Sequence, residues 1–509
     1  MSPRIVFLAV LLAGCGAKED DRGATLRADV VGRETSDAGA PRRAIVAASQ
    51  IGLTSFDGAG QVVPGLASSW RIADNGLSVI FRLRPRAWPD GKPVTGSDVV
   101  ASFRRAAQPG SRNALRSLLL GFENGPEVLS GAKPTSVLGV GAPVDNVVEV
   151  RLAGAMPHLL AMLAEPEFAV TRPGVRPPPL GPFRVADSDK VPIMLTRNTA
   201  TVPNPKVTLA AIALTPVDDP GAAVARFARD RTDLVVGNGL AGFGDARLMA
   251  SSNALRVEPA WAVYGYLANT AQGPLADVRV RRALSMAIDR DDLGSRLFGV
   301  ALPAVLGLVP PLPSERVPAL PDWAISAPAA RLDLARQLLA AAGYSPAAPL
   351  TVTISLPDAR EHAMVATEIA ADWARIGVRT QTIARPAALH AQVVARGDYE
   401  LALIERSGID SPFAFVLPYT CAAKSAGYCN PAADALVENA AATPDPIAQA
   451  ATLGLAEAAM VADAPFIPLF APVRWALVAR RVTGWSSNAA GHHPLALLGI
   501  EGGRAASTR

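Results

Sequence analysis

Aromatic residues, charged residues and cysteine are all scarce in this chain of 509 residues. Phe, Trp and Tyr make up 5% of the sequence and charged residues only 18%, whereas hydrophobic residues make up 50%. This balance provides for a large apolar core and argues against a disordered chain. The 49 Lys and Arg residues nearly balance the 45 Asp and Glu residues and form no basic block, so nothing indicates a nucleic-acid partner.

Long apolar runs are also missing, since no stretch of 18 consecutive apolar residues occurs. Residues 5–13, which follow Arg4, are apolar, but a bilayer span needs about 20 such residues. A positive charge before a short apolar stretch is typical of a secretion signal. The stretch ends in residues 12–15 (LAGC), which resembles the bacterial lipobox, so we predict a lipoprotein signal peptide over residues 1–15 and lipidation of Cys15. The alternative is an ordinary signal peptide with an incidental cysteine.

A polar stretch rich in small residues follows, over residues 16–41. Because few of its side chains could bury apolar area, we predict a flexible tether. Acyl chains on Cys15 would anchor the protein to a membrane without a spanning helix, on the periplasmic or cell-surface side. The remainder of the chain is long enough for two or three domains.

Two further cysteines, Cys421 and Cys429, are separated by seven residues in a turn-rich stretch. In an oxidising compartment such a pair is predicted to form a disulfide, which would stabilise the fold by roughly 2–3 kcal/mol. The alternative is a zinc site, but the neighbouring sequence offers no His or further Cys to complete four ligands.

Motifs for enzyme chemistry are absent or weak. The sequence has no GxSxG, HExxH or GxxxxGK[ST] motif and only five histidines. Residues 237–242 (GNGLAG) follow a strand-like segment and fit GxGxxG, which could bind a pyrophosphate; a loop near a hinge is the alternative that we favour. His492 and His493 are adjacent, so a strand would point them to opposite faces, and we expect packing instead of metal binding. We therefore expect no enzyme activity, no metal and no cofactor.

Strand and helix patterns alternate along the chain, which indicates an α/β fold. Strands are predicted at residues 44–48, 79–83, 144–152 and 350–355 from their β-branched content or alternation. Helices are predicted after a capping box at residues 95–98, after Asp277, and at residues 334–342 and 363–376, each of the last two before a glycine. The helix after Asp277 has one apolar stripe with its arginines off it; the stripe comprises Val280, Ala283, Leu284, Ala287 and Ile288.

Three blocks of sequence carry a family resemblance. They are residues 63–70 (VPGLASSW) with the segment 81–100, residues 277–290 (DVRVRRALSMAIDR) and residues 335–344 (ARQLLAAAGY). In this order they resemble the signature of the family 5 extracytoplasmic solute-binding proteins of ABC importers, which include oligopeptide- and dipeptide-binding proteins. The resemblance extends from about residue 45 to about residue 468.

The resemblance implies a two-lobed periplasmic-binding-protein fold of type II, in its large three-domain variety, with a hinge. Lobe one would comprise residues 42–60, 181–270 and 475–501, with a second domain inserted at residues 61–180. Lobe two would comprise residues 271–474. Ligand would be enclosed when the lobes close.

The family also implies candidate ligand-binding residues. Some members place an acidic residue of lobe two against the α-amino group of a peptide, and Asp410 is the nearest counterpart; a plain turn residue is the alternative. Arg406 could pair with a ligand carboxylate or form a surface salt bridge. Trp261, Tyr264 and Tyr266 could line the pocket or pack in the core, with the two tyrosines on one strand face. The segment before residues 63–70 is shorter than in the family, which puts the standard peptide pocket in doubt.

These features predict a monomeric substrate-binding lipoprotein that captures a peptide-like solute and delivers it to a membrane permease. One alternative is a receptor for a non-peptide solute such as a sugar, opine, nickel chelate or antibiotic-like compound. Another is an envelope sensor or scaffold that keeps the fold without a ligand.

Overall fold

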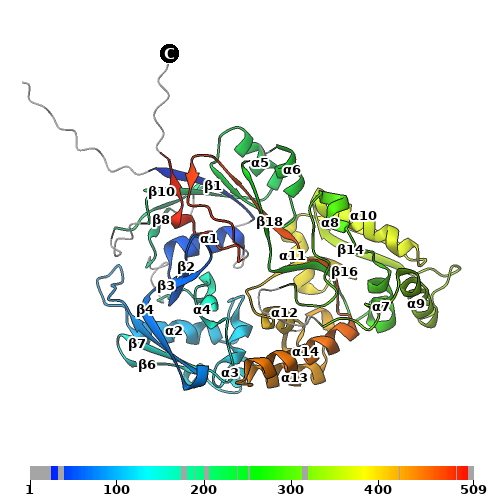
Figure 1. Ribbon diagram of the computed structural model, residues 1–509, viewed down its shortest axis with the longest axis horizontal. Helices are drawn as coiled ribbons and strands as arrows, with labels where there is room; N and C mark the ends of the chain where they lie inside the picture. Colours follow the sequence, from blue (N-terminus) through cyan, green and yellow to red (C-terminus); the bar gives the residue numbers. More distant parts are fainter. Residues whose placement is uncertain are drawn as a thin grey trace, which may run out of the picture.

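The computed structural model describes residues 24–32, 39–172, 180–187, 190–199, 206–237, 239–249, 253–311, 319–423, 425–488 and 490–501. Three of its β-sheets carry the architecture, with helices packed against them (Figure 1). They have seven, five and four strands. The α/β fold predicted from the sequence is confirmed.

The seven-stranded sheet has the order β12-β18-β11-β1-β10-β9-β8. Its central strand β1 runs parallel to β10 and β11, while the outer pairs are antiparallel. Helix α1 (Ala40–Ser49) packs against β1 and β8, and α5 (Pro220–Ala228) against β1, β10 and β11. The strands are β1 (Thr25–Val31), β8 (Phe183–Asp187), β9 (Ile193–Arg197), β10 (Ala211–Val217), β11 (Leu234–Val236), β12 (Leu255–Pro259) and β18 (Val473–Val478).

Strand β1 and helix α1 correct two predictions. Strand β1 lies inside residues 16–41, which were predicted to be a flexible tether, and residues 44–48, predicted to be a strand, belong to α1. Helix α1 has a proline in its first turn, a favoured position, and buries Ile45 in one core with alternate residues of β1. Because residues 32–62 separate β1 from the 63–70 block, the predicted shortening of this segment is also wrong.

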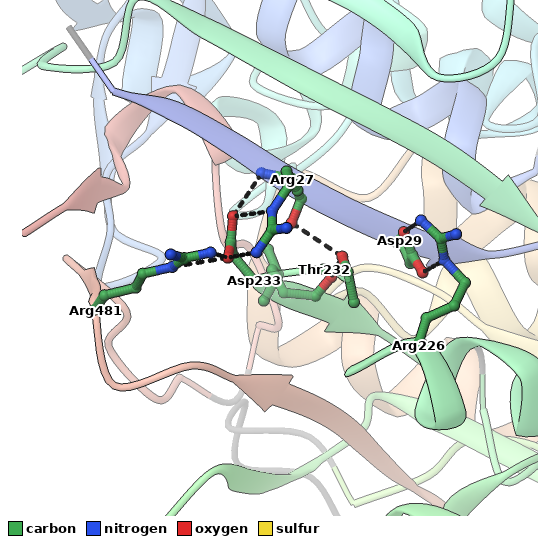
Figure 2. Close-up of polar contacts among 7 residues, drawn as sticks. Arg27, Asp29, Arg226, Thr232, Asp233 and Arg481 are labelled. Carbon is green, nitrogen blue, oxygen red and sulfur yellow. Dashed lines mark hydrogen bonds and ion pairs between the residues drawn. The ribbon is translucent and has the colours of Figure 1, made fainter. Parts of the chain in front are cut away.

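Charged residues of β1 explain why its sequence looks like a tether. Arg27 donates hydrogen bonds from its backbone N–H and its guanidinium to Asp233, which also binds Arg481 (Figure 2). Asp29 accepts from Nε of Arg226 at 2.6 Å. Both carboxylates are 1% exposed, so these charges lie inside the sheet with partners from distant elements, not in solvent.

The five-stranded sheet has the order β15-β14-β16-β13-β17. Strand β14 runs parallel to β15 and β16, whereas β13 is antiparallel to β16 and β17. The strands are β13 (Ala262–Ala268), β14 (Thr351–Pro357), β15 (Arg379–Arg385), β16 (Leu401–Ser407) and β17 (Phe466–Phe470). The accompanying helices are α7 (Val278–Ala287), α8 (Leu293–Phe298), α9 (Pro328–Ala341), α10 (Arg360–Ala374), α11 (Ala387–Arg396), α12 (Phe413–Val416), α13 (Pro431–Ala441) and α14 (Pro446–Asp463).

Helix α7 follows its prediction with one exception. Asp277 is the N-cap, since its side chain accepts from the N–H of Arg279 at 2.8 Å, and the apolar stripe is buried. Arg281, expected on the exposed face, is only 5% exposed. Its guanidinium donates to backbone carbonyls, including those of Leu275 and Ala464. It therefore ties α7 to the end of α14.

The four-stranded sheet, of order β4-β5-β7-β6, lies apart from the other two (Figure 1, lower left). The predicted capping box starts α2: Asp98 accepts from the Thr95 N–H at 2.9 Å, and Thr95 Oγ1 accepts in return. The predicted strand at 144–152 is the second half of a hairpin. The elements are β4 (Ala67–Ala73), β5 (Ser78–Leu83), β6 (Val140–Val144), β7 (Val147–Arg151), α2 (Gly96–Ala107), α3 (Gly125–Ser130) and α4 (Leu159–Met162), with the hairpin β2 (Thr54–Phe56) and β3 (Val62–Pro64) nearby.

The chain crosses between the seven- and five-stranded sheets at two short segments. Residues 260–261 link β12 to β13, and residues 471–472 link β17 to β18. The two crossings are bonded to each other, because the N–H of Ala260 donates to the carbonyl of Pro472 at 3.2 Å. Strand β13 thus lies in the five-stranded sheet, although residues 181–270 were expected in lobe one. Only two residues link β12 to β13, so no loop or turn pattern in the sequence marks the point where the chain changes sheet.

Further elements of the described chain are α6 (Phe243–Met249), the small sheet β19 (Val482–Thr483) with β20 (Gly499–Ile500), and short 3-10 helices. Cys421 and Cys429 are joined in a disulfide. None of the helices within the described ranges has the length and apolar character needed to cross a bilayer. Cys15 and most of the predicted tether lie outside the described residues.

Candidate functional site

The candidate site lies where the two crossings meet the end of β16, a region that we call the junction. Trp261, one of the predicted ligand-binding residues, is in the first crossing and is half-buried. Its carbonyl accepts a hydrogen bond from the N–H of Gly408 at 3.0 Å. This bond continues the pairing of β13 with β16 and places the turn that follows β16 beside the crossing.

Asp410 is half-buried in the turn between β16 and α12. The next residue, Ser411, is fully buried, and its hydroxyl lies 3.3 Å from Nε2 of His158, just before α4. Burial lowers the pKa of His158 to about 4, so its imidazole is neutral at pH 7. The turn that carries Asp410 is therefore contacted from the domain of the four-stranded sheet.

Arg406 packs against an aromatic ring instead of forming the surface salt bridge that was the alternative. Its guanidinium carbon lies 5.2 Å from the ring centroid of buried Tyr419, a cation–π contact. Its Nε is buried and has no hydrogen-bond partner among the residues that the structure describes. Arg406, Asp410 and Trp261 thus lie on two neighbouring segments, the end of β16 with the turn after it and the first crossing.

Tyr264 and Tyr266 share one face of β13, but that face belongs to the core. Both are 0% exposed, so of the two alternatives the structure shows packing in the core. The Tyr264 hydroxyl is 2.9 Å from Nδ1 of His362, and its ring stacks on Phe470 at 4.7 Å. Tyr266 packs near Trp373. Helix α10 covers this side of the sheet, which strand alternation alone does not reveal.

Glu405 is a junction residue that the sequence analysis missed. Its carboxylate accepts one hydrogen bond, from the N–H of Leu240 at 3.3 Å. Burial raises its pKa to about 7, although that bond and the nearby Arg474 oppose the rise. Its signal in the sequence is a charge that directly follows four apolar strand residues, 401–404.

The glycine-rich stretch of the GxGxxG pattern lies between β11 and α6, where Gly237 and residues 239–242 are in a loop. Gly239 and Gly242 have φ of +67° and +75°, a conformation that favours glycine. Backbone N–H groups of this loop and of α6 meet two carboxylates, Glu405 and Glu361. Its donors are thus occupied by protein carboxylates, which favours the loop near a hinge over the dinucleotide site.

A second group of charged side chains and histidines lies next to α1. Arg43 pairs with Glu165 at 2.8 Å and also with Glu167, and His492 Nε2 lies 3.3 Å from the other oxygen of Glu165. His493 pairs with Glu258 at 2.8 Å. Arg43, Glu165 and the two histidines line a cavity of about 200 Å³.

The histidine pair has a packing role, as predicted. His492 stacks on Phe56 with ring centroids 3.7 Å apart, and His493 on Trp485 at 3.8 Å. Within the described ranges no three His, Cys, Asp or Glu side chains are grouped closely enough to hold a metal ion. The junction combines charged side chains, a turn and the two crossings between the sheets.

Comparison with known proteins shows the family of the chain. The model for bacterial extracellular solute-binding proteins, family 5 (middle), matches residues 61–427. The periplasmic oligopeptide-binding protein OppA of Salmonella typhimurium is 26% identical over 469 residues, which cover 87% of this chain and 84% of OppA. The periplasmic murein peptide-binding protein MppA of Escherichia coli is 25% identical over 461 residues, 86% of this chain and 84% of MppA.

Solved structures show the same fold. Haemophilus influenzae OppA in complex with the peptide RPPGFSPFR superposes with a TM-score of 0.84 at 22% identity, covering 94% of this chain and 99% of that one. The unliganded open form of MppA gives a TM-score of only 0.64 at 22% identity, covering 94% and 97%. The match of the family model to more than half of the residues, with this fold, shows that the chain belongs to the family 5 bacterial extracellular solute-binding proteins.

Proposed function

We propose that this protein is the substrate-binding lipoprotein of an ABC importer and captures a peptide-like solute at the junction. The observation that carries the proposal is the half-buried acid Asp410, held beside the crossing between the sheets. The two relatives named above are peptide-binding proteins, and this chain matches more than four-fifths of the length of each, which supports the peptide class. Cys15 would anchor the protein outside the cytoplasm, and a separate membrane permease would receive the solute.

The seven-stranded and four-stranded sheets would form lobe one, and the five-stranded sheet lobe two. The two crossings at residues 260–261 and 471–472 would then be the hinge, since only these short segments of the described chain connect the two larger sheets directly. The higher TM-score with a peptide complex than with an unliganded open form supports a closed arrangement here. Ligand contacts with both lobes would stabilise that closed form.

At the junction, Asp410 would pair with the ammonium group of a peptide. Such a pair is stronger in a half-buried site than in water, because the effective dielectric constant is lower. Arg406 would face a carboxylate of the ligand, and Trp261 would pack against its backbone or side chain. The binding is non-covalent and uses no cofactor.

Thermal denaturation with candidate ligands tests the proposal. A ligand at about 100 times its dissociation constant adds roughly 2.7 kcal/mol to stability, which moves the melting curve measurably. We expect di- to pentapeptides to stabilise the protein and Asp410→Asn to weaken this effect about tenfold in affinity. Asp358→Asn, in a loop between β14 and α10, is the control and keeps wild-type affinity. Peptide binding that Asp410→Asn leaves unchanged would refute the role of Asp410.

A non-peptide solute is the second candidate. It is favoured by one relative, the probable deoxycholate-binding periplasmic protein YgiS of Escherichia coli, 25% identical over 454 residues with 82% of each chain covered. The same denaturation series with free amino acids, sugars, bile acids and Ni²⁺ separates the two. Stabilisation by one of these and by no peptide would change the substrate class, and no stabilisation by any would favour a sensor or scaffold.

A further inference from the structure

The loop before α6, residues 239–242, and the first two residues of α6 are fixed to the seven-stranded sheet, and so to lobe one. The N–H of Gly237 donates to the carbonyl of Trp475 in β18 at 3.0 Å, and the Trp475 indole N–H donates to the carbonyl of Ala241 at 3.2 Å. A Cβ on Gly237 would lie 2.3 Å from the indole ring, so only glycine allows this approach. The loop must therefore move with lobe one.

Two carboxylates of lobe two reach this loop. Glu361, in the first turn of α10, accepts from the N–H of Gly242 at 3.2 Å and of Gly244 at 2.9 Å. Glu405, on β16, accepts from the N–H of Leu240 at 3.3 Å. Among the described residues, every hydrogen bond of these two carboxylates goes to lobe one.

The small size of the loop residues is what lets the carboxylates come close. A Cβ on Gly239 would lie 2.2 Å from Oε2 of Glu405, and one on Gly244 would lie 2.9 Å from Oε1 of Glu361. The glycine pattern that resembles a nucleotide-binding motif thus accommodates anions that the protein itself supplies. A hydrogen bond to a charged acceptor is about twice as strong as one between neutral groups, so the two bonds to Glu361 favour the closed arrangement. Burial raises the pKa of Glu405 to about 7, so its single bond favours closure only once Glu405 has taken up a proton.

A further hydrogen bond from α6 links the two lobes. Arg247, on α6 of lobe one, donates to the carbonyl of Phe298 at the end of α8 in lobe two. Opening the lobes would break all of these bonds and leave Glu361, 4% exposed here, without its partners until water replaced them.

We propose that Glu361 and Glu405 are a latch that binds residues 239–244, at the start of α6, and holds the two lobes together before any ligand arrives. The latch rests on the proposed division into two closing lobes. It acts on the position of the lobes and touches no ligand, so Glu361 and Glu405 are positioning residues. The ligand would then meet a partly closed population and spend less of its binding free energy on closure.

The test measures the lobe-to-lobe distance in the full chain without ligand. Spin labels on Ile72→Cys in lobe one and Ile447→Cys in lobe two, which are 60% and 80% exposed, report opening by double electron–electron resonance. The background carries Cys15→Ser, and the native disulfide pairs the other cysteines. We expect a closed distance in the unliganded wild type, with the closed-to-open ratio lowered about tenfold by Glu361→Gln through loss of charge on two hydrogen bonds.

Glu457→Gln is the matched control. Glu457 is also a fully buried glutamate that accepts from two backbone N–H groups, of Leu308 and Val309, each at 3.0 Å, but all three residues lie within lobe two. Its substitution should leave the closed fraction unchanged. Gly244→Ala tests the same contact from lobe one, because the added methyl group would crowd the Glu361 carboxylate and should open the lobes as Glu361→Gln does. Alanine is a good helix former, so the substitution should not disrupt α6 itself.

Two results would overturn the latch. One is an unliganded wild type without the closed distance; the other is a closed fraction in Glu361→Gln and Gly244→Ala that equals that of the control. Peptide titration by calorimetry is measured separately on the same variants. Failure to bind peptide would therefore count against the proposed function, whereas the ligand-free distances decide the latch.

Discussion

The buried carboxylate of Asp233 is expected to be a main support of the seven-stranded sheet. It lies at the start of β11, is 1% exposed, and binds Arg27 of β1 and Arg481 after β18 (Figure 2). Asp233→Asn keeps the shape but removes the charge from both pairs. Breaking a buried pair costs about 3–5 kcal/mol, but the two arginine side chains are 38% and 48% exposed and can be rehydrated, so we expect about 2–3 kcal/mol.

The assay is urea denaturation followed by tryptophan fluorescence, with Asp322→Asn as the control. Asp322 also pairs with an arginine, Arg282 at 2.6 Å, but is 70% exposed, so its loss should cost no more than about 1 kcal/mol. Equal midpoints for the two variants would refute the reasoning that burial makes the Asp233 network strong.

The pH dependence gives a second measure of the same network. Burial raises the pKa of the Asp233 carboxyl, but the hydrogen bonds from Arg27 and Arg481 outweigh burial and hold its pKa below the ordinary value. A lowered pKa means that its contribution is complete above the ordinary carboxyl pKa, about 4, and is lost as the pH falls further. Wild type and Asp233→Asn should therefore converge in stability below pH 4.

Three further outcomes are expected. Because Glu405 has a pKa of about 7 here and an ordinary value of about 4.3 when solvated, closure would take up a proton; the closed-to-open ratio of the unliganded protein, measured by the same spin-label distances relative to Glu405→Gln, should rise about tenfold from pH 8 to pH 6, and an unchanged ratio would contradict this. Thr95→Ala removes half of the capping box with Asp98 and should lower the unfolding free energy by about 1 kcal/mol in urea, whereas Thr95→Ser should restore most of it. Tyr264→Phe leaves His362 without its hydroxyl partner and should lower the unfolding free energy by about 1–2 kcal/mol in the same assay. A loss of peptide affinity at unchanged stability would instead indicate that Tyr264 binds the ligand.

Local signals in the sequence predict local structure well. The capping box at Thr95, the N-cap Asp277 and the glycine after α9 need only neighbouring residues, and the structure has all three. The family blocks extend this to the whole fold, which the solved structures confirm, although β13 was expected with lobe one and lies in the five-stranded sheet. The family resemblance also suggested Asp410, which lies in the turn that follows β16.

Charged residues inside the protein account for most of what the sequence did not reveal. Strand β1 carries Arg27 and Asp29, whose partners lie about 200 positions away in the chain, at separations of 206 and 197. Arg281 is buried because backbone carbonyls from the end of another helix accept its hydrogen bonds. Pairings at such distances depend on the finished topology, so composition alone assigns these side chains to solvent.

The position of β1 also limits how far the protein can stand from a membrane. If Cys15 carries the lipid, ten Cα–Cα steps separate the anchor from Thr25, the first residue of the central strand. Even a fully extended chain spans at most about 3.6 Å per residue, so roughly 36 Å is the longest reach from the bilayer surface. Lobe one would be confined to the volume just above the bilayer, with a restricted set of orientations, and a permease in the same membrane would encounter it at a high effective concentration.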